Sequence, residues 1–316
     1  MATALEEFQQ HLSRAKRFLT REDWKCADAT PGKAFVAALM ASAAYLEIRD
    51  FELDQSGRVK LVPCLAYQEL AARRQGVAVW EYLRRTSLGD EESMAEPVIV
   101  VTERLVAVVQ KMSNVIFVAL RGTRFFHGSD WRDDLKIAFS GRLVGTTPIC
   151  FHRGFHDAVV ECLPEVGRTL QRLNPNSKIP VYVVGHSLGG AMAGVAHTIR
   201  DNQFINPHTK ATFKSAALAF HSAYTFGMPR FCDSRGATGQ TALHHTYSRA
   251  DPVPYLPPLK LGYSDAGQEY CLGIFRGWRQ CARPNWSIFH AATELLSGYL
   301  PHTIEGYVRQ LGLNLS

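Results

Sequence analysis

The most constraining feature of this chain is a serine on a glycine-rich turn between a strand-like run and a helix-like run. Residues 179–184 are rich in β-branched side chains, and Ser187 to Ile199 has the texture of a helix. Between them, residues 185–190 read Gly-His-Ser-Leu-Gly-Gly. This is the G-x-S-x-G pattern in the strand–turn–helix context that lifts a serine hydroxyl clear of a sheet. The pattern predicts that Ser187 is a nucleophile, and that side chains at positions 185 and 189 would collide with the neighbouring strand and helix.

The rest of the chain alternates short apolar runs with helix-like stretches. Such alternation implies an α/β fold whose sheet is mostly parallel and covered by helices on both faces. The proline-rich stretch 251–258 lies between strands and is expected to be an ordered loop. Further strands are predicted at 97–101, 105–110, 115–120, 223–226 and 243–247, and helices at 155–173 and, broken at Pro301, at 285–311.

The first 90 residues carry helix-like patterns only, with helices predicted at 5–19, 33–51 and 65–85. The apolar run 34–48 is shorter than the ~20 residues needed to span a bilayer, so we expect a buried, alanine-rich helix there. We therefore expect residues 1–90 to form a helical N-terminal extension packing on the core, and residues 91–316 to form one catalytic domain.

Composition excludes several classes of protein. Of the 316 residues, 46% are hydrophobic, which is ample for a large core and excludes disorder for most of the chain. The net charge of +6 is spread along the chain, so it slightly favours anionic surfaces and does not indicate nucleic acid as a partner. The seven cysteines form no zinc-binding pattern. Their odd number favours free thiols in a reducing compartment, although three disulfides and one thiol would give the same count.

The N-terminal sequence, Met-Ala-Thr-Ala-Leu-Glu-Glu, is acidic where a signal peptide is basic. No membrane-spanning run and no targeting signal are visible in the sequence. These observations favour the cytoplasm, or export by a signal-independent system.

An aspartate that orients a catalytic histidine is expected after the nucleophile, at the carboxyl end of a later strand. Asp251 follows the predicted strand 243–247 and is favoured by its position. Asp233 follows the preceding strand and remains the alternative, whereas Asp201 lies near the end of the nucleophile helix and would face away. Either of the first two could instead be a turn or cap residue.

The histidine should follow the aspartate in the chain, which leaves His290 and His302. His302 lies on a loop before a helix and is free to turn its ring toward Ser187, whereas His290 lies in an apolar run that favours a packed helical histidine. His186 is next to the nucleophile, but adjacent residues on such a turn point apart, so we expect it to pack beneath the turn.

An acyl-transfer site needs two donors for the oxyanion. The amide of Leu188, directly after the serine, is the first candidate, and the second is Thr123, which ends a buried strand in Arg-Gly-Thr. The latter could also be an ordinary strand-ending turn. Phe125 and Phe126 follow at once and indicate either a small lid or acyl-chain contact, or burial against the sheet.

With these residues in hand, the chain resembles the class 3 lipases, the family of the fungal triacylglycerol lipases and their bacterial and plant relatives. The resemblance runs from about Val98 to the C-terminus and depends on several motifs in the family's order. In chain order they are Leu120 to Thr123, Asp130 to Leu135 (D-W-x-x-D-L), His152 to Phe155 (H-x-G-F), the G-H-S-L-G-G turn, Gly227 to Arg230 (G-x-P-R), Asp251 to Pro254 (D-P-V-P), and His302 with Tyr307 (H-x-x-x-x-Y).

The resemblance implies an α/β-hydrolase fold, a triad of Ser187, Asp251 and His302, and an oxyanion hole formed by the amides of Thr123 and Leu188. It favours Asp251 over Asp233, and His302 over His290. The segment between Thr123 and Trp131 is short for a large helical lid, and residues 1–90 match nothing in the family.

The implied function is that of a serine carboxylic-ester hydrolase acting on acylglycerol-like lipid esters through an acyl-enzyme, with no metal or organic cofactor. The expected partners are a lipid or ester substrate and, transiently, a membrane or lipid interface. One alternative is phospholipase A activity, and one use of such activity would be in an exported antibacterial effector paired with a neutralising protein. Another is a catalytically inactive lipid-binding relative, which the intact set of Ser187, Asp251 and His302 argues against.

Overall fold

A computed structural model of the chain describes residues 4–45, 97–102, 104–112, 114–122, 139–144, 147–200, 203–205, 212–214, 218–273, 277–283 and 302–315. Several predictions fall outside these residues. They concern the helix at 65–85, most of the helix at 285–311, the domain boundary at residue 90, and the residues Thr123, Phe125, Phe126, Asp201 and His290.

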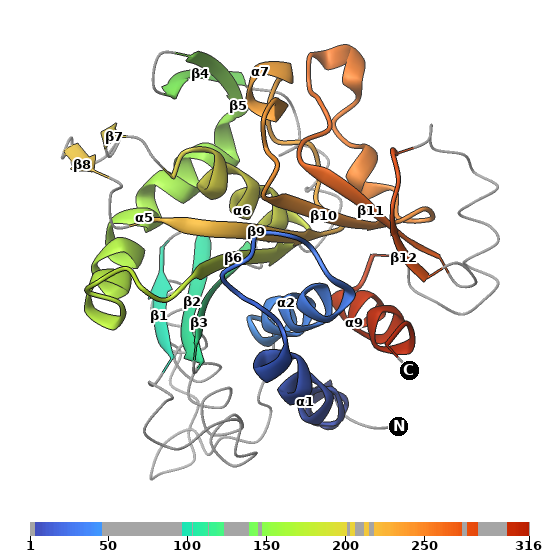
Figure 1. Cartoon of the computed structure of the whole chain (residues 1–316). Helices are drawn as coiled ribbons and strands as arrows, with labels where there is room; N and C mark the ends of the chain where they lie inside the picture. The colour runs from blue at the N-terminus through green and yellow to red at the C-terminus, as the bar shows by residue number, and fades with distance from the viewer. Residues whose placement is uncertain are drawn as a thin grey trace, which may run out of the picture.

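The centre of the molecule is an eight-stranded sheet with the order β1-β2-β3-β6-β9-β10-β11-β12 (Figure 1). Strands β3, β6, β9, β10 and β11 run parallel to one another, and the pairs at the two edges are antiparallel. The prediction of a mostly parallel sheet flanked by helices is therefore confirmed. The strands are β1 (Val98–Val101), β2 (Leu105–Met112), β3 (Val115–Gly122), β6 (Val181–His186), β9 (Phe220–Phe226), β10 (Leu243–Ser248), β11 (Gln268–Gly273) and β12 (Gly277–Gln280).

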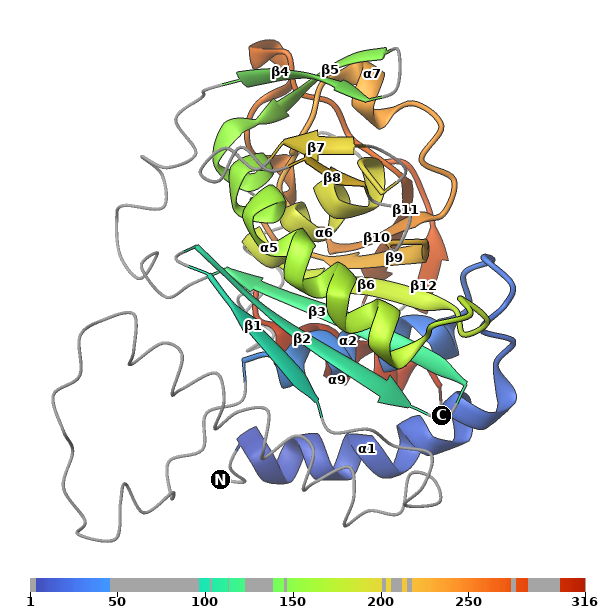
Figure 2. The ribbon, with the colours of Figure 1, turned by 90° about the vertical axis from the view of Figure 1, so that its left-hand side faces the viewer.

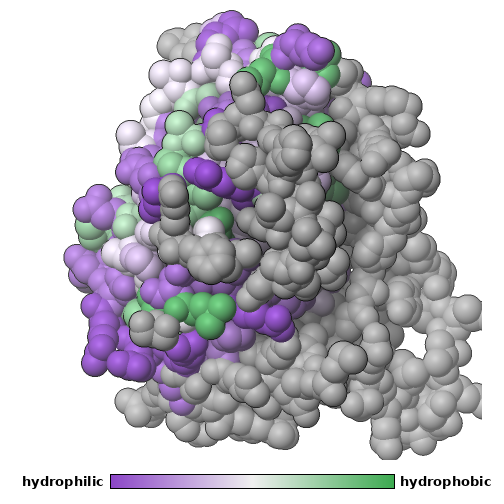
Figure 3. Space-filling view, turned by 90° about the vertical axis from the view of Figure 1, so that its right-hand side faces the viewer, coloured by the Kyte–Doolittle hydropathy of each residue, from purple (hydrophilic) through white to green (hydrophobic). Residues whose placement is uncertain are grey.

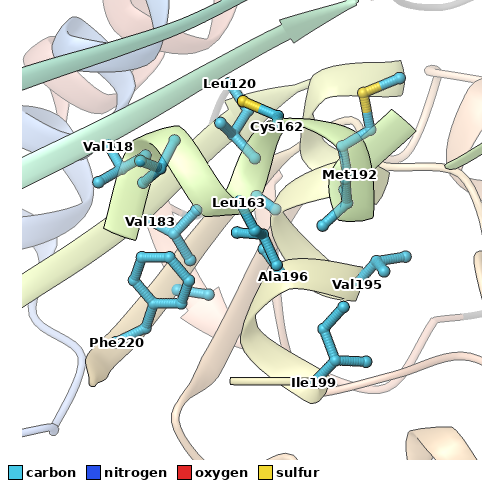
Figure 4. Packing of buried hydrophobic residues seen from close by; sticks show 14 of the residues in the cluster. Val118, Leu120, Cys162, Leu163, Val183, Met192, Val195, Ala196, Ile199 and Phe220 are labelled. Atoms are coloured by element: carbon cyan, nitrogen blue, oxygen red, sulfur yellow. The ribbon is translucent and has the colours of Figure 1, made fainter. Parts of the chain in front are cut away.

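The side chains of the central strands alternate between two hydrophobic clusters, as the two-residue period of a strand requires. In β6, Val181 and Val183 face one cluster while Tyr182 and Val184 face the other. The first cluster is covered by α5 (Arg153–Leu173) and α6 (Leu188–Thr198). Figure 4 shows this packing between β3, β6 and β9 and the two helices, with Val118, Leu120, Cys162, Leu163, Val183, Met192, Val195, Ala196, Ile199 and Phe220 labelled.

The opposite face of the sheet is covered by α2 (Pro31–Ala43) and α9 (Ile304–Leu313), and α1 (Ala4–Arg21) lies against the far side of α2 (Figure 1). Residues 32–43 of α2 are all buried, so the predicted alanine-rich buried helix is confirmed. Its predicted end at residue 51 is wrong, because the helix ends at Ala43. The end of the helix coincides with two contacts to the sheet. Arg121 Nη1 donates a hydrogen bond to the carbonyl of Ala44, and the Tyr45 hydroxyl donates one to the carbonyl of His186 in β6.

The connection between α1 and α2 is hydrogen-bonded to the sheet near the amino ends of β6 and β10. Tyr182 donates its hydroxyl hydrogen bond to the carbonyl of Trp24 at 2.8 Å, and His244 Nε2 lies 2.9 Å from the carbonyl of Ala27. The buried Lys33 ammonium donates to the carbonyl of Cys26 at 2.7 Å. Because Tyr45, beyond the other end of α2, contacts the last residue of β6, α2 runs from the amino ends of the strands to their carboxyl ends.

Smaller elements lie above the α5–α6 layer (Figure 2). Strands β4 (Phe139–Val144) and β5 (Thr147–His152) form one antiparallel pair, and β7 (Gln203–Ile205) and β8 (Thr212–Lys214) form another. The short helix α7 (Ser234–Ala237) and two 3₁₀ turns, η4 (Val253–Tyr255) and η5 (Leu259–Leu261), complete the set of described elements.

On the face in Figure 3, the coloured residues are mainly hydrophilic, with small groups of hydrophobic residues between them. Large exposed hydrophobic side chains among the described residues are those of Leu259, Leu261 and Leu313. No helix in the described part of the chain combines the length and the hydrophobicity that crossing a membrane would require. The six cysteines in this part are free thiols.

Buried histidines predict a loss of stability in mild acid. Burial lowers the pKa of His197 to about 3, and it lowers the pKa of His186 and of His245 well below the ordinary value. Below pH ~6.5 the unfolded chain therefore binds protons that the folded chain does not, and the free energy of unfolding decreases as the pH is lowered. Urea unfolding at pH 7.5, 6.5 and 5.5 should show this decrease. In His197→Gln the decrease should be shallower, and an unchanged slope would contradict the assignment.

Candidate active site

The turn that carries Ser187 joins the end of β6 to the start of α6. Ser187 has φ 56° and ψ −128°, a backbone conformation that costs free energy for any residue other than glycine. Its amide donates to the carbonyl of Phe226 at 2.9 Å. A Cβ at position 185 would lie 2.3 Å from the Gly189 oxygen, and one at position 189 would lie 2.2 Å from the Leu120 oxygen. The predicted need for small residues on both sides of the serine is confirmed.

His302 lies directly before α9 and its ring joins two predicted site residues. Nε2 is 2.8 Å from the Ser187 hydroxyl oxygen, and Nδ1 is 2.7 Å from Oδ2 of Asp251. Asp251 follows β10 and is fully buried, whereas the His302 side chain is 29% exposed. The structure thus brings together three residues that come from three separate elements, at the edge of the sheet where β6 and β10 end.

The Asp251 carboxylate has further hydrogen-bond donors. The Tyr307 hydroxyl, from α9, donates to Oδ2 at 2.7 Å, and the Val253 amide donates to Oδ1 at 2.9 Å. The same hydroxyl accepts a hydrogen bond from the Ser248 amide at 3.1 Å. The sequence motif includes Tyr307 but gave it no role. The available sequence signal was its place five residues after His302 in that motif.

Replacing Tyr307 with phenylalanine should destabilise the fold. The change removes a hydrogen bond to a buried carboxylate, and bonds of this kind contribute about 1.5–3 kcal/mol. Urea unfolding at pH 7.5 should show a loss in that range. The matched change Tyr270→Phe removes a hydroxyl that donates to Gln268 on the same strand, and it should cost less because no charged partner is lost. An equal cost for both variants would contradict the assigned bond.

Gly227 lies directly against the side chains of Asp251, His302 and Tyr307. It follows β9 with φ 55°, a conformation that favours glycine. A Cβ there would lie 2.7 Å from Oδ2 of Asp251, 3.1 Å from His302 Nδ1 and 3.1 Å from the Tyr307 hydroxyl. Gly227 is the first residue of the G-x-P-R motif, and its role follows from this close approach.

The alternative residues weighed from the sequence lie elsewhere. Asp233 caps α7 by accepting the Gly236 amide at 3.0 Å and pairs with Arg235. His186 is buried, with its ring centroid 4.8 Å from that of His302. Burial lowers its pKa well below the ordinary value, so it packs beside His302 as a neutral ring.

The loop that follows Asp251 is held by two arginines whose side chains are buried. Arg230, the last residue of the G-x-P-R motif, donates to the carbonyl of Pro257 at 2.9 Å and pairs with Asp265 at 2.6 Å. Arg283, beyond β12, also pairs with Asp265, at 2.9 Å, and contacts Glu269 and the carbonyl of Pro254. The predicted ordered loop is confirmed. Its attachment to Arg283 had no sequence signal.

The amide of Leu188 begins α6, where the positive end of the helix favours negative charge. Thr123, the second predicted oxyanion donor, comes directly after β3 and lies outside the described residues, as do Phe125 and Phe126. Within the described ranges there is no group of three or more His, Cys, Asp or Glu side chains that could hold a metal ion. Chemically, the site offers a hydroxyl, a base in contact with it and a buried carboxylate behind the base.

Comparison with known sequences agrees with this arrangement. A sequence model of the family described as Lipase (class 3) matches residues 117–261. The lipase of Rhizomucor miehei is 30% identical over 161 residues, which is 49% of this chain and 41% of that protein. Phospholipase A1-IIgamma of Arabidopsis thaliana is 30% identical over 152 residues, 46% of this chain and 33% of that protein. A secreted mono- and diacylglycerol lipase of Fusarium solani is 32% identical over 130 residues, covering 38% and 34%.

The chain thus spans between a third and about two fifths of the length of the curated relatives it matches. The fold extends further than the sequence similarity. Lipase II of Rhizopus niveus superposes with a TM-score of 0.51 at 18% identity, over 87% of this chain and 94% of that one. A mutant form of MDLA from Penicillium cyclopium gives 0.51 at 19% identity, over 90% and 100%. Both have the α/β-hydrolase fold that the central sheet and its two helical layers form here. Over a matched segment that runs from β3 through the serine turn to the loop after Asp251, the chain is similar to the class 3 lipases.

Proposed function

We propose that this protein is a serine carboxylic-ester hydrolase that acts on acylglycerol-like lipid esters. The observation that carries the proposal is the continuous chain of hydrogen bonds from the Ser187 hydroxyl through the His302 ring to the buried Asp251 carboxylate. A serine hydroxyl is a weak nucleophile by itself and becomes effective when a base in contact takes its proton. The three groups stand in that relation in this structure.

In the proposed reaction, Ser187 Oγ bonds to the ester carbonyl carbon while its proton passes to His302 Nε2. Asp251 holds the Nδ1–H and stabilises the imidazolium that forms. The Leu188 and Thr123 amides bind the oxyanion. The tetrahedral intermediate then breaks its bond to the alcohol oxygen, which takes the proton from His302. A water molecule, deprotonated by the same ring, attacks the acyl-enzyme, releases the carboxylic acid and restores the serine.

Phospholipase A activity is the second candidate, and a specific observation favours it. One of the relatives is named a phospholipase A1, and the match to it extends over 152 residues. The chain's charge of +6 also favours an interface of anionic phospholipid. The chemistry at Ser187 would be unchanged, because only the group attached to the glycerol differs between the two substrates.

Labelling and a substrate panel test the proposal together. A fluorophosphonate probe should label Ser187, and the site can be located by peptide mapping. The panel should contain short- and long-chain nitrophenyl esters, a triacylglycerol emulsion and phospholipid vesicles. Turnover of the emulsion supports the first candidate, and turnover confined to vesicles supports the second. Preference for soluble short esters would make the protein an esterase. An unlabelled Ser187 without turnover would contradict both candidates and favour a lipid-binding protein.

A further inference from the structure

The carboxyl end of α2 contacts the two strands that lead into the candidate site. The Tyr45 hydroxyl donates a hydrogen bond to the main-chain carbonyl of His186 at 3.1 Å. Arg121, buried near the end of β3, donates through Nη1 to the carbonyl of Ala44 at 2.9 Å. The Arg121 guanidinium carbon lies 5.9 Å from the centre of the Tyr45 ring, within the range of a cation–π interaction. Residues 44 and 45, at the carboxyl end of α2, are therefore hydrogen-bonded to both β3 and β6.

Both of these contacts are made by residues that lie close in sequence to groups used in the proposed reaction. His186 is the residue directly before Ser187, and the Tyr45 ring also lies edge-on to the His186 ring at 5.9 Å. Arg121 is followed by Gly122 and Thr123, the predicted oxyanion donor. Both contacts of the helix end are thus within two residues of a group that the proposed reaction uses.

The segment that follows His302 also interacts electrostatically with Tyr45, through Glu305. Burial raises the pKa of the Tyr45 hydroxyl; the positive charge of Arg121 offsets part of this rise, and the negative charge of Glu305 adds to it. Glu305 is in the first turn of α9, three residues after His302. The hydroxyl therefore stays protonated and available as a donor at neutral pH.

We propose that Tyr45 is a positioning residue, which holds the Ser187 turn in register with the strand that carries the second oxyanion donor. The inference rests on the proposed function, because positioning has a measurable effect only where Ser187 reacts. Arg121 completes the arrangement by fixing the carbonyl before Tyr45. The N-terminal segment, which lies outside the residues matched by the family model, thereby takes part in building the site.

The physical reason is the conformation of the turn. Ser187 has an unfavourable positive φ, so surrounding contacts must hold it in place. The peptide group that joins His186 to Ser187 is held at both of its polar atoms: its N–H donates to the carbonyl of Phe226 in β9, and its carbonyl accepts from the Tyr45 hydroxyl. Loss of the second contact lets the hydroxyl move relative to His302 and the oxyanion donors, and small misplacements of reacting groups have large effects on rate.

The test compares two tyrosine-to-phenylalanine variants. Tyr45→Phe removes the hydroxyl but keeps the ring against His186 and Arg121. Tyr182→Phe is the matched control, since it removes a hydroxyl bonded to the same N-terminal segment at the opposite edge of the sheet. Turnover of a nitrophenyl ester should be measured as kcat and KM separately, per labelled active site. Titration of Ser187 with the fluorophosphonate counts only correctly folded molecules.

For Tyr45→Phe we expect kcat per site to fall about tenfold with KM unchanged, which corresponds to about 1.4 kcal/mol of lost transition-state stabilisation. The rate of labelling of Ser187 should fall in parallel. For Tyr182→Phe we expect a lower melting temperature and an unchanged kcat.

Wild-type kcat and labelling rate in Tyr45→Phe, whatever its melting temperature, would overturn the inference. Equal losses of kcat in both variants would also overturn it, because Tyr45 would then act only through overall stability. A wild-type protein that neither turns over any ester nor reacts with the probe would overturn the proposed function itself. The two failures are therefore distinguishable.

Discussion

Replacing Ser187 with alanine is expected to lower kcat for ester hydrolysis by at least about 10⁴-fold. The substitution removes the hydroxyl that His302 Nε2 contacts at 2.8 Å. Serine nucleophiles in triads contribute effects of this size, and the residual rate comes from the oxyanion donors and binding. Because alanine fills the same tight turn, circular dichroism and thermal melting should stay close to those of the wild type.

A matched control is Ser234→Ala, at an exposed serine that begins α7. This variant should keep its kcat within about twofold, as is usual for surface substitutions. The measurement is the steady-state hydrolysis of one nitrophenyl ester by all three proteins under the same conditions. Substantial activity in Ser187→Ala would mean that another group attacks the ester, and the proposed mechanism would be wrong.

Replacing Asp251 with asparagine is expected to lower kcat by about 10⁴-fold, the second largest effect. The carboxylate accepts from His302 Nδ1 at 2.7 Å and from the Tyr307 hydroxyl at 2.7 Å. An asparagine whose oxygen keeps the bond from the Val253 amide places its NH₂ group at the Oδ2 position, where it faces the His302 ring and the Tyr307 hydroxyl. Nδ1 must then accept, the proton moves to Nε2, and the ring can no longer take a proton from Ser187. The reaction loses its base although every residue keeps its place.

Asp233→Asn is the informative control, because Asp233 was the rival candidate in the sequence. Its side chain caps α7, so the amide variant should lose up to about 1 kcal/mol of stability and little activity. Steady-state kinetics and urea unfolding of both variants separate the two roles. A large kcat loss in Asp233→Asn with a small one in Asp251→Asn would reverse the assignment.

Much of the site could be predicted because its signals are local. The serine turn needs a strand before it, small residues around it and a helix after it, and all of these lie within about twenty residues. Asp251 was favoured because a strand precedes it, and His302 because a loop and a helix surround it. The chain-order rule of the fold and the motifs of the family then removed the alternatives.

The remaining site residues act through contacts between distant parts of the chain, which no local pattern encodes. Tyr45 and His186 are 141 residues apart in sequence. Tyr307 reaches Asp251 across 56 residues, and Arg283 holds the loop after Asp251 from beyond the last strand. Gly227 looks like an ordinary turn glycine until the atoms behind it are known.

The secondary structure shows the same contrast between features set by local sequence and features set by distant contacts. Buried strands such as β3 and β6 are continuous β-branched runs and were predicted closely. Strands β4, β5, β11 and β12 were missed, because their sequences are polar or mixed and their pairing depends on neighbours. The end of α2 was missed for a related reason. Its apolar pattern continues past Ala43, whereas the helix ends there, next to the bond between Arg121 and the carbonyl of Ala44.

The place of α2 in the molecule bears on how the protein is made. α1, which packs on one side of this helix, precedes it in the chain, whereas β6, β9 and α9, which bury its other sides, follow it. Because synthesis runs toward the C-terminus, the face of α2 that packs on the sheet has no native partner until those later elements have been made. That face must therefore be shielded in the meantime, and the Ser187 turn gains its contact with Tyr45 only when α2 docks on the finished sheet.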